Sequence, residues 1–223
     1  MVFKILDNYI SSGGDIQNKM QVLAPMYAGV AGIDALNEAI SERYNKQDDC
    51  IIRDGKKFKI KDKVLQLKND PELQIMNGDI GQILAITKVD DKDALLIDFD
   101  GRVVTYFAKN LDNLRLAYAI SIHKSQGSEY DNVILPILPS YNIMLKKKLI
   151  YTAITRAKKK VIVLGKLDTL ENAIHNPDPI RQTSLLQRIE DIKDIGNVIV
   201  DSDIPFDTLG EYDMENITPY SFM

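Results

Sequence analysis

The chain has 223 residues, of which 45% are hydrophobic and 27% charged, and this balance is typical of an ordinary soluble globular protein. Its formal net charge of −4 argues against a protein that coats nucleic acid through overall charge, so any such contact must come from a local basic patch. No stretch approaches the roughly 20 apolar residues needed to cross a bilayer. Two histidines and one cysteine exclude an internal disulfide and the usual structural zinc site, so we expect a cytoplasmic protein with no membrane segment and no metal ligands.

The first 50 residues carry the pattern of an α/β domain. Residues 21–26 read QVLAPM and predict a short buried strand that is stopped by Pro25. A helix is predicted over 33–45, because apolar side chains recur at helical spacing from Ile33 to Tyr44. A strand, a loop and a helix in this order form the repeating unit of an α/β sheet, and we assign 1–50 to its first part.

The pattern changes to short alternating strands after residue 50. Segments 95–99 and 103–107 flank Asp100-Gly101, which is a strong signal for a two-residue hairpin. Asn77-Gly78 is a second turn signal. Several short strands separated by turns favour a small β-barrel, which we place at 51–114 as an insertion in the α/β domain.

The α/β pattern returns over 115–168. Ser121 is expected to cap a short helix that ends at Gln126, with Gly127 in the left-handed position after it. Further along, we predict a strand at 133–136, a helix at 149–157 and a buried parallel strand at 161–165. Three residues of that helix are expected to face inward: Leu149, Ala153 and Ile154. Residues 169–223 form a helix-rich extension whose end is acidic and mixed in composition.

Residues 118–131 read YAISIHKSQGSEYD and gather chemically useful groups around a glycine turn. A hydroxyl, an imidazole, an ammonium, an amide and a carboxylate occur within a few positions, and we expect them at one edge of the sheet. Backbone N–H groups and a lysine at such an edge can bind phosphate. The alternative is a solvated loop between strands.

Arg156 follows an apolar helical face and precedes a strand, so it is expected on the same rim of the sheet as the glycine turn. Its guanidinium can donate two parallel hydrogen bonds to a phosphate. The alternative is a surface arginine beside the lysines at 158–160, which we interpret as a solvated basic edge.

Together these segments resemble the RecD/TraA-like group of superfamily 1 DNA helicases. Residues 121–130 resemble motif V of that group, with Ser121 in place of its usual threonine and Tyr130 in place of its usual phenylalanine. Residues 151–158 read YTAITRAK and match motif VI throughout, and residues 21–37 resemble the opening of the second motor domain. The resemblance implies a RecA-like, P-loop-NTPase-type α/β domain (2A), interrupted by an SH3-like barrel (2B).

The resemblance also implies a role for each matching residue. Arg156 would be the arginine finger that stabilises charge on the γ-phosphate. The nucleotide side would be lined by Gly127 and Glu129, with Gln126 between the nucleotide and DNA sides. The track for single-stranded DNA would be lined by three residues: Ser121, His123 and Lys124.

The sequence lacks a P-loop, because neither Gly55-Lys56 nor Gly165-Lys166 has the required flanking glycine and hydroxyl residue. We also find no Walker B motif, so we expect an excised fragment that is inactive alone and that needs an upstream RecA-like domain to bind ATP and Mg²⁺. The resemblance implies a 5′→3′ helicase of DNA recombination and repair, such as an exodeoxyribonuclease V α chain with its nuclease and helicase partner subunits. The alternatives are a TraA-type relaxase-helicase and a non-enzymatic nucleic-acid-binding module.

Overall fold

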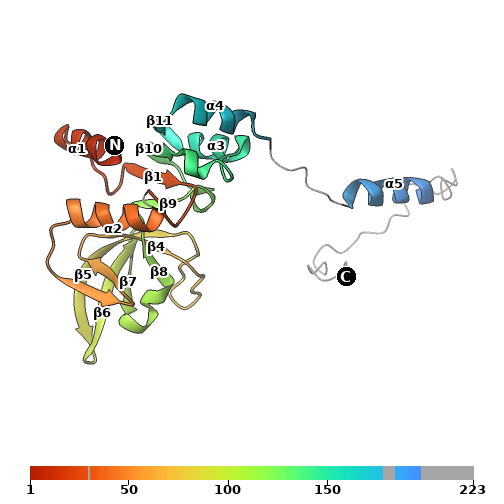
Figure 1. Cartoon of the computed structure of the whole chain (residues 1–223). Coiled ribbons are helices and arrows are strands. Elements are labelled where there is room, and N and C mark those ends of the chain that lie inside the picture. The colour runs from red at the N-terminus through yellow and green to blue at the C-terminus, as the bar shows by residue number, and fades with distance from the viewer. Residues whose placement is uncertain (30, 178–183, 197–223) are drawn as a thin grey trace. The chain divides into compact units, whose positions relative to one another are not determined.

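The structure, a computed structural model, describes residues 1–29, 31–177 and 184–196. It contains two units, Met1–Asp178 and Pro179–Met223 (Figure 1). The first unit holds residues 1–168 and the start of the predicted C-terminal extension, which continues in the second unit.

A four-stranded parallel sheet forms the centre of the first unit. Its strands are β1 (Met20–Ala24), β9 (Ala119–Ser121), β10 (Tyr130–Ile137) and β11 (Ala157–Gly165), in the spatial order β11-β10-β1-β9. All three neighbouring pairs are parallel. Each strand joins the next through a crossover connection, as parallel pairing requires. The predicted α/β class with a RecA-like sheet is confirmed.

Helices cover both faces of this sheet. Alternate residues of β1 point to opposite faces, so Met20, Val22 and Ala24 pack with α1 (Val2–Ser11) and α2 (Ile33–Tyr44). On the other face, Leu23 joins the buried side chains of β10, α3 (Lys147–Ile154) and α4 (Leu167–His175). Figure 1 shows α1 and α2 lying apart from α3 and α4 around the sheet. The helix predicted at 33–45 is confirmed, whereas the sequence analysis did not identify α1.

The antiparallel strands lie between Cys50 and Leu116. A hairpin is formed by β2 (Cys50–Arg53) and β3 (Lys56–Lys59). A five-stranded sheet has the order β7-β6-β5-β4-β8 and consists of β4 (Lys63–Gln66), β5 (Ile80–Val89), β6 (Lys92–Phe99), β7 (Arg102–Phe107) and β8 (Leu114–Leu116). A separate core fills this region, and it includes Phe58, Ile83, Leu95 and Tyr106. The short 3₁₀ helix η1 (Ala108–Asn113) joins β7 to β8.

The Asp100-Gly101 turn forms as the sequence predicts. Both residues have positive φ, 52° and 87°, and Phe99 pairs with Arg102 across the hairpin. This conformation matches the right-handed twist of the two strands. Asp90 and Asp91 make an equivalent turn between β5 and β6, with φ of 50° and 58°. The sequence analysis did not identify that turn, because neither residue is glycine.

Three predictions about 149–165 are wrong. The helix α3 ends at Ile154 instead of residue 157, and the side chain of Ile154 is 42% exposed while Ile150 takes the inward position. Strand β11 is not buried, because it lies at the edge of the sheet with β10 as its single neighbour, and all of its residues are partly or fully exposed. Apolar composition alone does not distinguish an edge strand from a central one.

The described part of the second unit contains α5 (Leu185–Gly196), which agrees with the predicted helix-rich extension. The side chains of Leu185, Ile189 and Ile192 are exposed on it. Residues 197–223, which include most of the predicted acidic tail, lie outside the described residues. Within the part of the chain that the structure describes, no helix has the length and apolarity needed to traverse a bilayer.

Candidate functional site

The segment 122–129 crosses the sheet from one edge to the other. Ser121 pairs with Ala24 at the carboxyl end of β9, whereas Tyr130 lies two positions before the pair Met20–Asn132 at the amino end of β10. At about 3.3 Å per residue, these two levels are about 20 Å apart along the strands. The prediction that all its polar groups share one edge is therefore wrong, because the end of one parallel strand and the start of the next lie at opposite edges.

Ser121, His123 and Lys124 lie at the carboxyl edge. Ser121 belongs to β9 and is 6% exposed, and its Oγ accepts a hydrogen bond from the backbone N–H of Lys124 at 3.2 Å. The predicted helix is only the 3₁₀ turn η2 (His123–Ser125), which Ser121 stabilises from the strand instead of capping an α-helix. His123 is exposed, and Lys124 is half-buried with its Nζ donating to Asn77 Oδ1.

Gln126, Gly127 and Glu129 lead to the amino edge, and all three are exposed. Gly127 has a φ of 87°, so the left-handed conformation predicted for it is present. Glu129 forms an ion pair with Lys158, with 3.4 Å between Oε2 and Nζ. The carboxylate of Glu129 and the bend at Gly127 therefore border the start of β10.

Arg156 joins this amino edge from the loop between α3 and β11. Its Nη1 donates to the carbonyl of Ser128 at 3.2 Å, and its own carbonyl accepts from Tyr130 N–H at 2.8 Å. Its Nε donates to the Thr152 carbonyl and its Nη2 to Thr155 Oγ1, both at 3.3 Å. The structure thus brings Arg156 together with residues 128–130, and every guanidinium nitrogen has an acceptor from the chain.

Two of the three lysines in β11 pair with acidic side chains. Lys158 contacts Glu129, and Lys159 lies 2.7 Å from Asp131. The hydrogen bond from the Lys159 ammonium holds the pKa of the Asp131 carboxyl below its ordinary value. The basic edge interpreted from residues 158–160 is solvated, as predicted, but its charge is partly neutralised.

A cavity of about 360 Å³ lies between the β4–β5 connection and the 122–129 segment. Asn77, Gly78 and Asp79 form one wall, and the other is formed by His123, Lys124, Gln126 and Ser128. The sequence analysis recognised Asn77-Gly78 as a turn but gave it no functional role. No short-range pattern links that turn to residues 122–129, because the contact joins segments about 47 positions apart.

A buried polar network lies where the antiparallel strands meet α2 and β9. The Asp62 carboxylate, which is fully buried, accepts hydrogen bonds from Ser41, Asn45 and Tyr118 side chains and from Lys59 N–H. Among the described residues, no cationic side chain donates a hydrogen bond to this carboxylate. Because the buried charge is satisfied by groups from both parts, the network holds the antiparallel strands in place against α2 and β9.

Lys63 is a second buried charge at the same junction. Its Nζ donates to Gln21 Oε1 at 2.8 Å, and Gln21 in turn donates to the carbonyls of Ala117 and Tyr118. Burial lowers the pKa of Lys63 to about 8, with a smaller opposing effect from Asp15. Lys63 belongs to β4 and Gln21 belongs to β1. Their hydrogen bond therefore joins the antiparallel strands to the parallel sheet.

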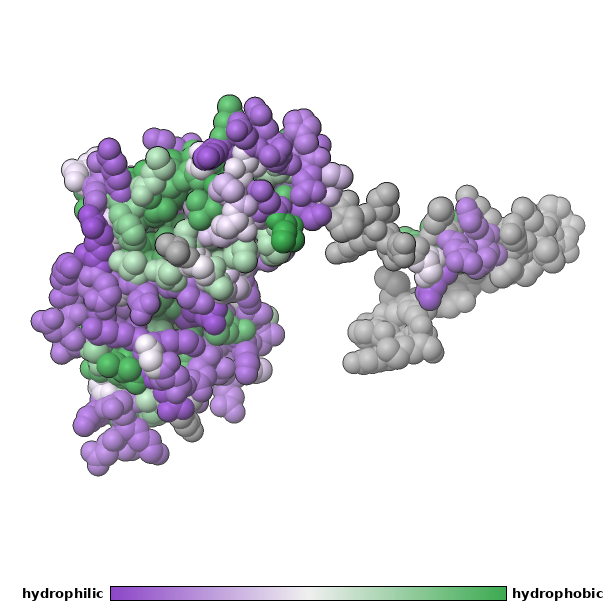
Figure 2. Space-filling view, in the orientation of Figure 1, coloured by the Kyte–Doolittle hydropathy of each residue, from purple (hydrophilic) through white to green (hydrophobic). Residues whose placement is uncertain are grey.

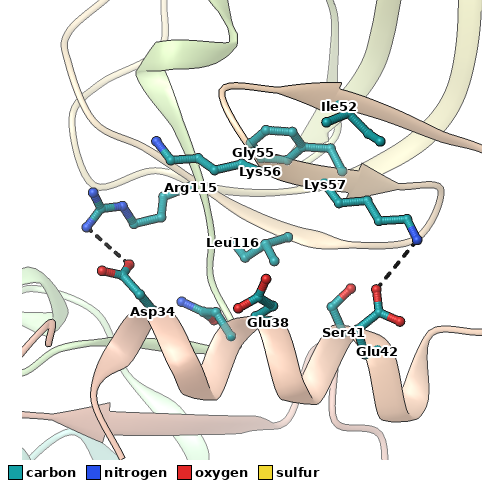
Figure 3. Close-up of a pocket in the computed structure, with 12 residues that line it drawn as sticks. Asp34, Glu38, Ser41, Glu42, Ile52, Gly55, Lys56, Lys57, Arg115 and Leu116 are labelled. Atoms are coloured by element: carbon teal, nitrogen blue, oxygen red, sulfur yellow. Dashed lines mark ion pairs between the residues drawn. The ribbon is translucent and has the colours of Figure 1, made fainter. Parts of the chain in front are cut away.

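Another cleft, of about 350 Å³, separates α2 from the β2–β3 hairpin (Figure 3). It contains none of the residues to which the sequence analysis gave a functional role. Ion pairs bridge it near both ends, between Arg115 and Asp34 at 3.5 Å and between Lys57 and Glu42 at 3.6 Å. Glu38 and Lys56 also line the cleft, and the ion pairs across it give it the features of a packing junction.

The surface near Arg156 is partly apolar. Tyr151 and Ile154 of α3 are 70% and 42% exposed and lie within five positions of Arg156. Figure 2 shows one face of the molecule, on which hydrophobic residues gather over the part that holds the parallel sheet, while the part with the antiparallel strands is mostly hydrophilic. Across the described ranges, no group of three or more His, Cys, Asp or Glu side chains is arranged to hold a metal ion.

Two family models match the chain. The UvrD-like helicase C-terminal domain matches residues 116–164, which include β9, η2, β10, α3 and most of β11. The ATP-dependent RecD-like DNA helicase SH3 domain matches residues 36–99, which include β2 to β6. The two matches cover the parallel and the antiparallel parts of the first unit.

Curated relatives match the same region. The chain is 35% identical over 171 residues to the ATP-dependent RecD2 DNA helicase of Deinococcus radiodurans, which covers 76% of the chain and 23% of the relative. It is 32% identical over 162 residues to the RecBCD enzyme subunit RecD of Buchnera aphidicola, covering 69% of the chain and 26% of the relative. The chain thus spans about a quarter of the length of these relatives.

The chain is also similar to a solved structure of a Pif1 helicase from Bacteroides in complex with ADP-AlF3 and ssDNA. The match covers 83% of this chain and 48% of the Pif1 chain, with 18% sequence identity and a TM-score of 0.48. The two family models and the RecD relatives agree with the resemblance found in residues 121–130 and 151–158. On this evidence the chain belongs to the family of RecD-like helicases.

Proposed function

We propose that the chain is the second motor domain of an ATP-dependent DNA helicase, which supplies an arginine finger and part of the track for single-stranded DNA. The observation that carries this proposal is the hydrogen bond from Arg156 to the Ser128 carbonyl. It joins the two helicase-like segments at the amino edge of the sheet, while Ser121 and Lys124 lie at the opposite edge. The 122–129 segment has one end at the proposed DNA side and the other at the proposed nucleotide side, so it is suited to link the state of the nucleotide to the contact with DNA.

The nucleotide side of this proposal consists of Arg156, Gly127, Glu129 and, beside them, Gln126. A guanidinium at this edge fits a phosphate, because it offers a fork of donors with a fixed positive charge. ATP supplies the phosphoanhydride bond that is cleaved. We assign no Mg²⁺ ligand to this chain, since the described residues offer no cluster suited to one. In this proposal the P-loop and the metal ligands belong to an upstream RecA-like domain of a longer protein.

A phosphate would compete with the present partners of Arg156. Its three nitrogens now donate to the Ser128 and Thr152 carbonyls and to Thr155 Oγ1. A phosphate oxygen carries more negative charge than these neutral acceptors, so it would draw the guanidinium away from them. Loss of the hydrogen bond from Arg156 to the Ser128 carbonyl would directly change the contacts of the 122–129 segment. The exposed Tyr151 and Ile154 beside Arg156 support an upstream domain that packs against this edge.

The DNA side consists of Ser121, His123 and Lys124. Lys124 and His123 face the cavity and would contact the phosphates of single-stranded DNA. Ser121 is buried and already bonded to the Lys124 amide, so its contribution would be to hold the turn that presents the lysine. We further propose 5′→3′ movement, a cytoplasmic location and a role in recombination or repair, as an exodeoxyribonuclease V α chain with partner subunits or as a stand-alone relative.

The arginine finger is tested in a longer parent protein that includes the upstream domain. Arg156→Ala is expected to lower DNA-stimulated ATP hydrolysis by about 10³-fold, because that is the usual scale for losing such a group. Arg156→Lys should recover little, since an ammonium cannot fork to the phosphate. Lys160→Ala is the matched control, because Lys160 is an exposed cation four positions away. Near-normal turnover of Arg156→Ala would contradict the assignment.

The second test uses the 223-residue chain itself. We expect no release of phosphate from ATP above background, with or without single-stranded DNA, because positioning of the nucleotide requires groups that this sequence lacks. We also expect weak binding of single-stranded DNA that falls as salt is raised, since phosphate contacts release counterions. Turnover that disappears in Arg156→Ala would mean that the chain contains a complete nucleotide site. Absence of any DNA binding would contradict the proposed track.

A further inference from the structure

The turn at residues 76–79, between β4 and β5, is closed by its own hydrogen bonds. Asp79 Oδ2 accepts from the Met76 N–H at 2.8 Å, and the Met76 carbonyl accepts from the Asp79 N–H at 3.1 Å. Asn69 Oδ1 accepts from the Asn77 N–H at 2.8 Å, and the Gln66 carbonyl from the Gly78 N–H at 2.9 Å. Every backbone N–H of the turn is paired, so its conformation is fixed and it has no free amide to offer a ligand.

The same turn is anchored in the core of the antiparallel sheet. Gln66, whose carbonyl accepts from Gly78, belongs to β4 and is fully buried. Its side chain accepts from the Tyr106 hydroxyl at 2.7 Å and donates to the Lys68 carbonyl at 2.7 Å. Both ends of the buried amide are therefore satisfied, and the turn keeps its place relative to β4 and β7.

The side chain that this rigid turn presents is that of Asn77. Its Oδ1 accepts a hydrogen bond from Lys124 Nζ, and both residues line the cavity shared with His123 and Gln126. The backbone of Lys124 is held separately by Ser121 Oγ. Lys124 is thus held at two points, at its backbone by Ser121 of β9 and at its ammonium by Asn77 of the β4–β5 connection.

We propose that Asn77 is a positioning residue that aims the Lys124 ammonium into this cavity, toward the phosphates of single-stranded DNA. The inference rests on the DNA role proposed for Lys124. A neutral amide oxygen suits the task, because it orients the ammonium without cancelling its charge. A carboxylate at the same position would form an ion pair and compete with the phosphate. The antiparallel part of the first unit would in this way control DNA affinity through Lys124 of η2.

Titration of fluorescein-labelled oligo(dT) with the 223-residue chain, followed by anisotropy over a range of KCl concentrations, tests the proposal. Asn77→Ala is expected to weaken binding by about three- to tenfold with an unchanged salt slope, because a flexible lysine must be immobilised on binding but keeps its charge. Asn77→Asp should reduce the salt slope by about one, as Lys124→Ala does, because both remove one effective phosphate contact. Asn77→Ala should add nothing to Lys124→Ala. Asn142→Ala, at an exposed asparagine outside the cavity, is the control.

A second measurement needs no DNA. Acetylation of Lys124 by acetic anhydride, quantified by mass spectrometry, should become faster in Asn77→Ala, while acetylation of Lys160 stays constant. Unchanged DNA affinity and unchanged Lys124 reactivity in Asn77→Ala would overturn the proposal. If Lys124→Ala binds DNA like the wild type, the DNA role of Lys124 is wrong, and the acetylation rate still decides whether Asn77 holds the ammonium. The two failures are thereby distinguished.

Discussion

Replacing Asp62 with asparagine should strongly destabilise the first unit, although the two side chains have nearly the same shape. Asp62 Oδ1 accepts from Ser41 Oγ at 2.9 Å, Asn45 Nδ2 at 2.8 Å and Tyr118 Oη at 2.9 Å. Its Oδ2 accepts from Lys59 N–H at 2.8 Å. All four partners donate to Asp62, so the side chain at this position needs two acceptor oxygens to satisfy them.

The expected magnitude follows from this geometry. In Asp62→Asn, the new NH₂ group that replaces Oδ2 faces the Lys59 N–H, and an unpaired buried donor costs about 1–3 kcal/mol. The three bonds to Oδ1 lose their charge assistance, which is worth about 1 kcal/mol for each. Burying an amide instead of a charge returns part of this loss. We therefore expect a decrease of about 3 kcal/mol in the free energy of unfolding, a large part of the roughly 5–15 kcal/mol of a typical domain.

Urea unfolding followed by far-ultraviolet circular dichroism measures this change. The midpoint should fall while the slope against urea stays constant, which indicates an effect on stability and not on compactness. Asp112→Asn is the matched control: its side chain is 58% exposed and its ion pair with Arg53 spans 3.6 Å, so the change should stay within about 0.5 kcal/mol. An Asp62→Asn variant as stable as the wild type, or an equal loss in Asp112→Asn, would refute the reasoning.

Two further predictions concern stability. The folded-state pKa of Lys63, about 8, lies below its ordinary value of 10.5, so the unfolded chain binds more protons above pH 8 and stability should rise by about 1.4 kcal/mol between pH 7 and pH 9. Lys63→Met should abolish this rise in urea titrations at the two pH values, and a rise that persists in the variant would exclude Lys63 as its source. Gly165→Ala should cost about 1–3 kcal/mol, because a Cβ there would lie 2.1 Å from the Ile137 carbonyl oxygen and push β11 from β10. A thermal unfolding midpoint equal to that of the wild type would show that the edge strand adjusts freely.

The sequence by itself determined the elements that depend on near neighbours. The helix at Ile33–Tyr44 follows from apolar residues spaced by three and four positions, and the Asp100-Gly101 turn from residues that tolerate positive φ. The helicase-like segments were recognisable because residues 121–130 and 151–158 are contiguous strings. Each of these features is encoded within about ten positions, so no knowledge of strand order was needed.

Only the tertiary structure decided which of these elements meet. Strand order makes β11 an edge strand and places Ser121 and Glu129 at opposite edges, although they are eight positions apart. The Asp62 network and the contact of Asn77 with Lys124 join segments separated by about 15 to 60 positions. Neither periodicity nor turn chemistry reports such distances, because hydrogen bonds between remote side chains depend on how the two sheets pack and not on the residues that flank each partner.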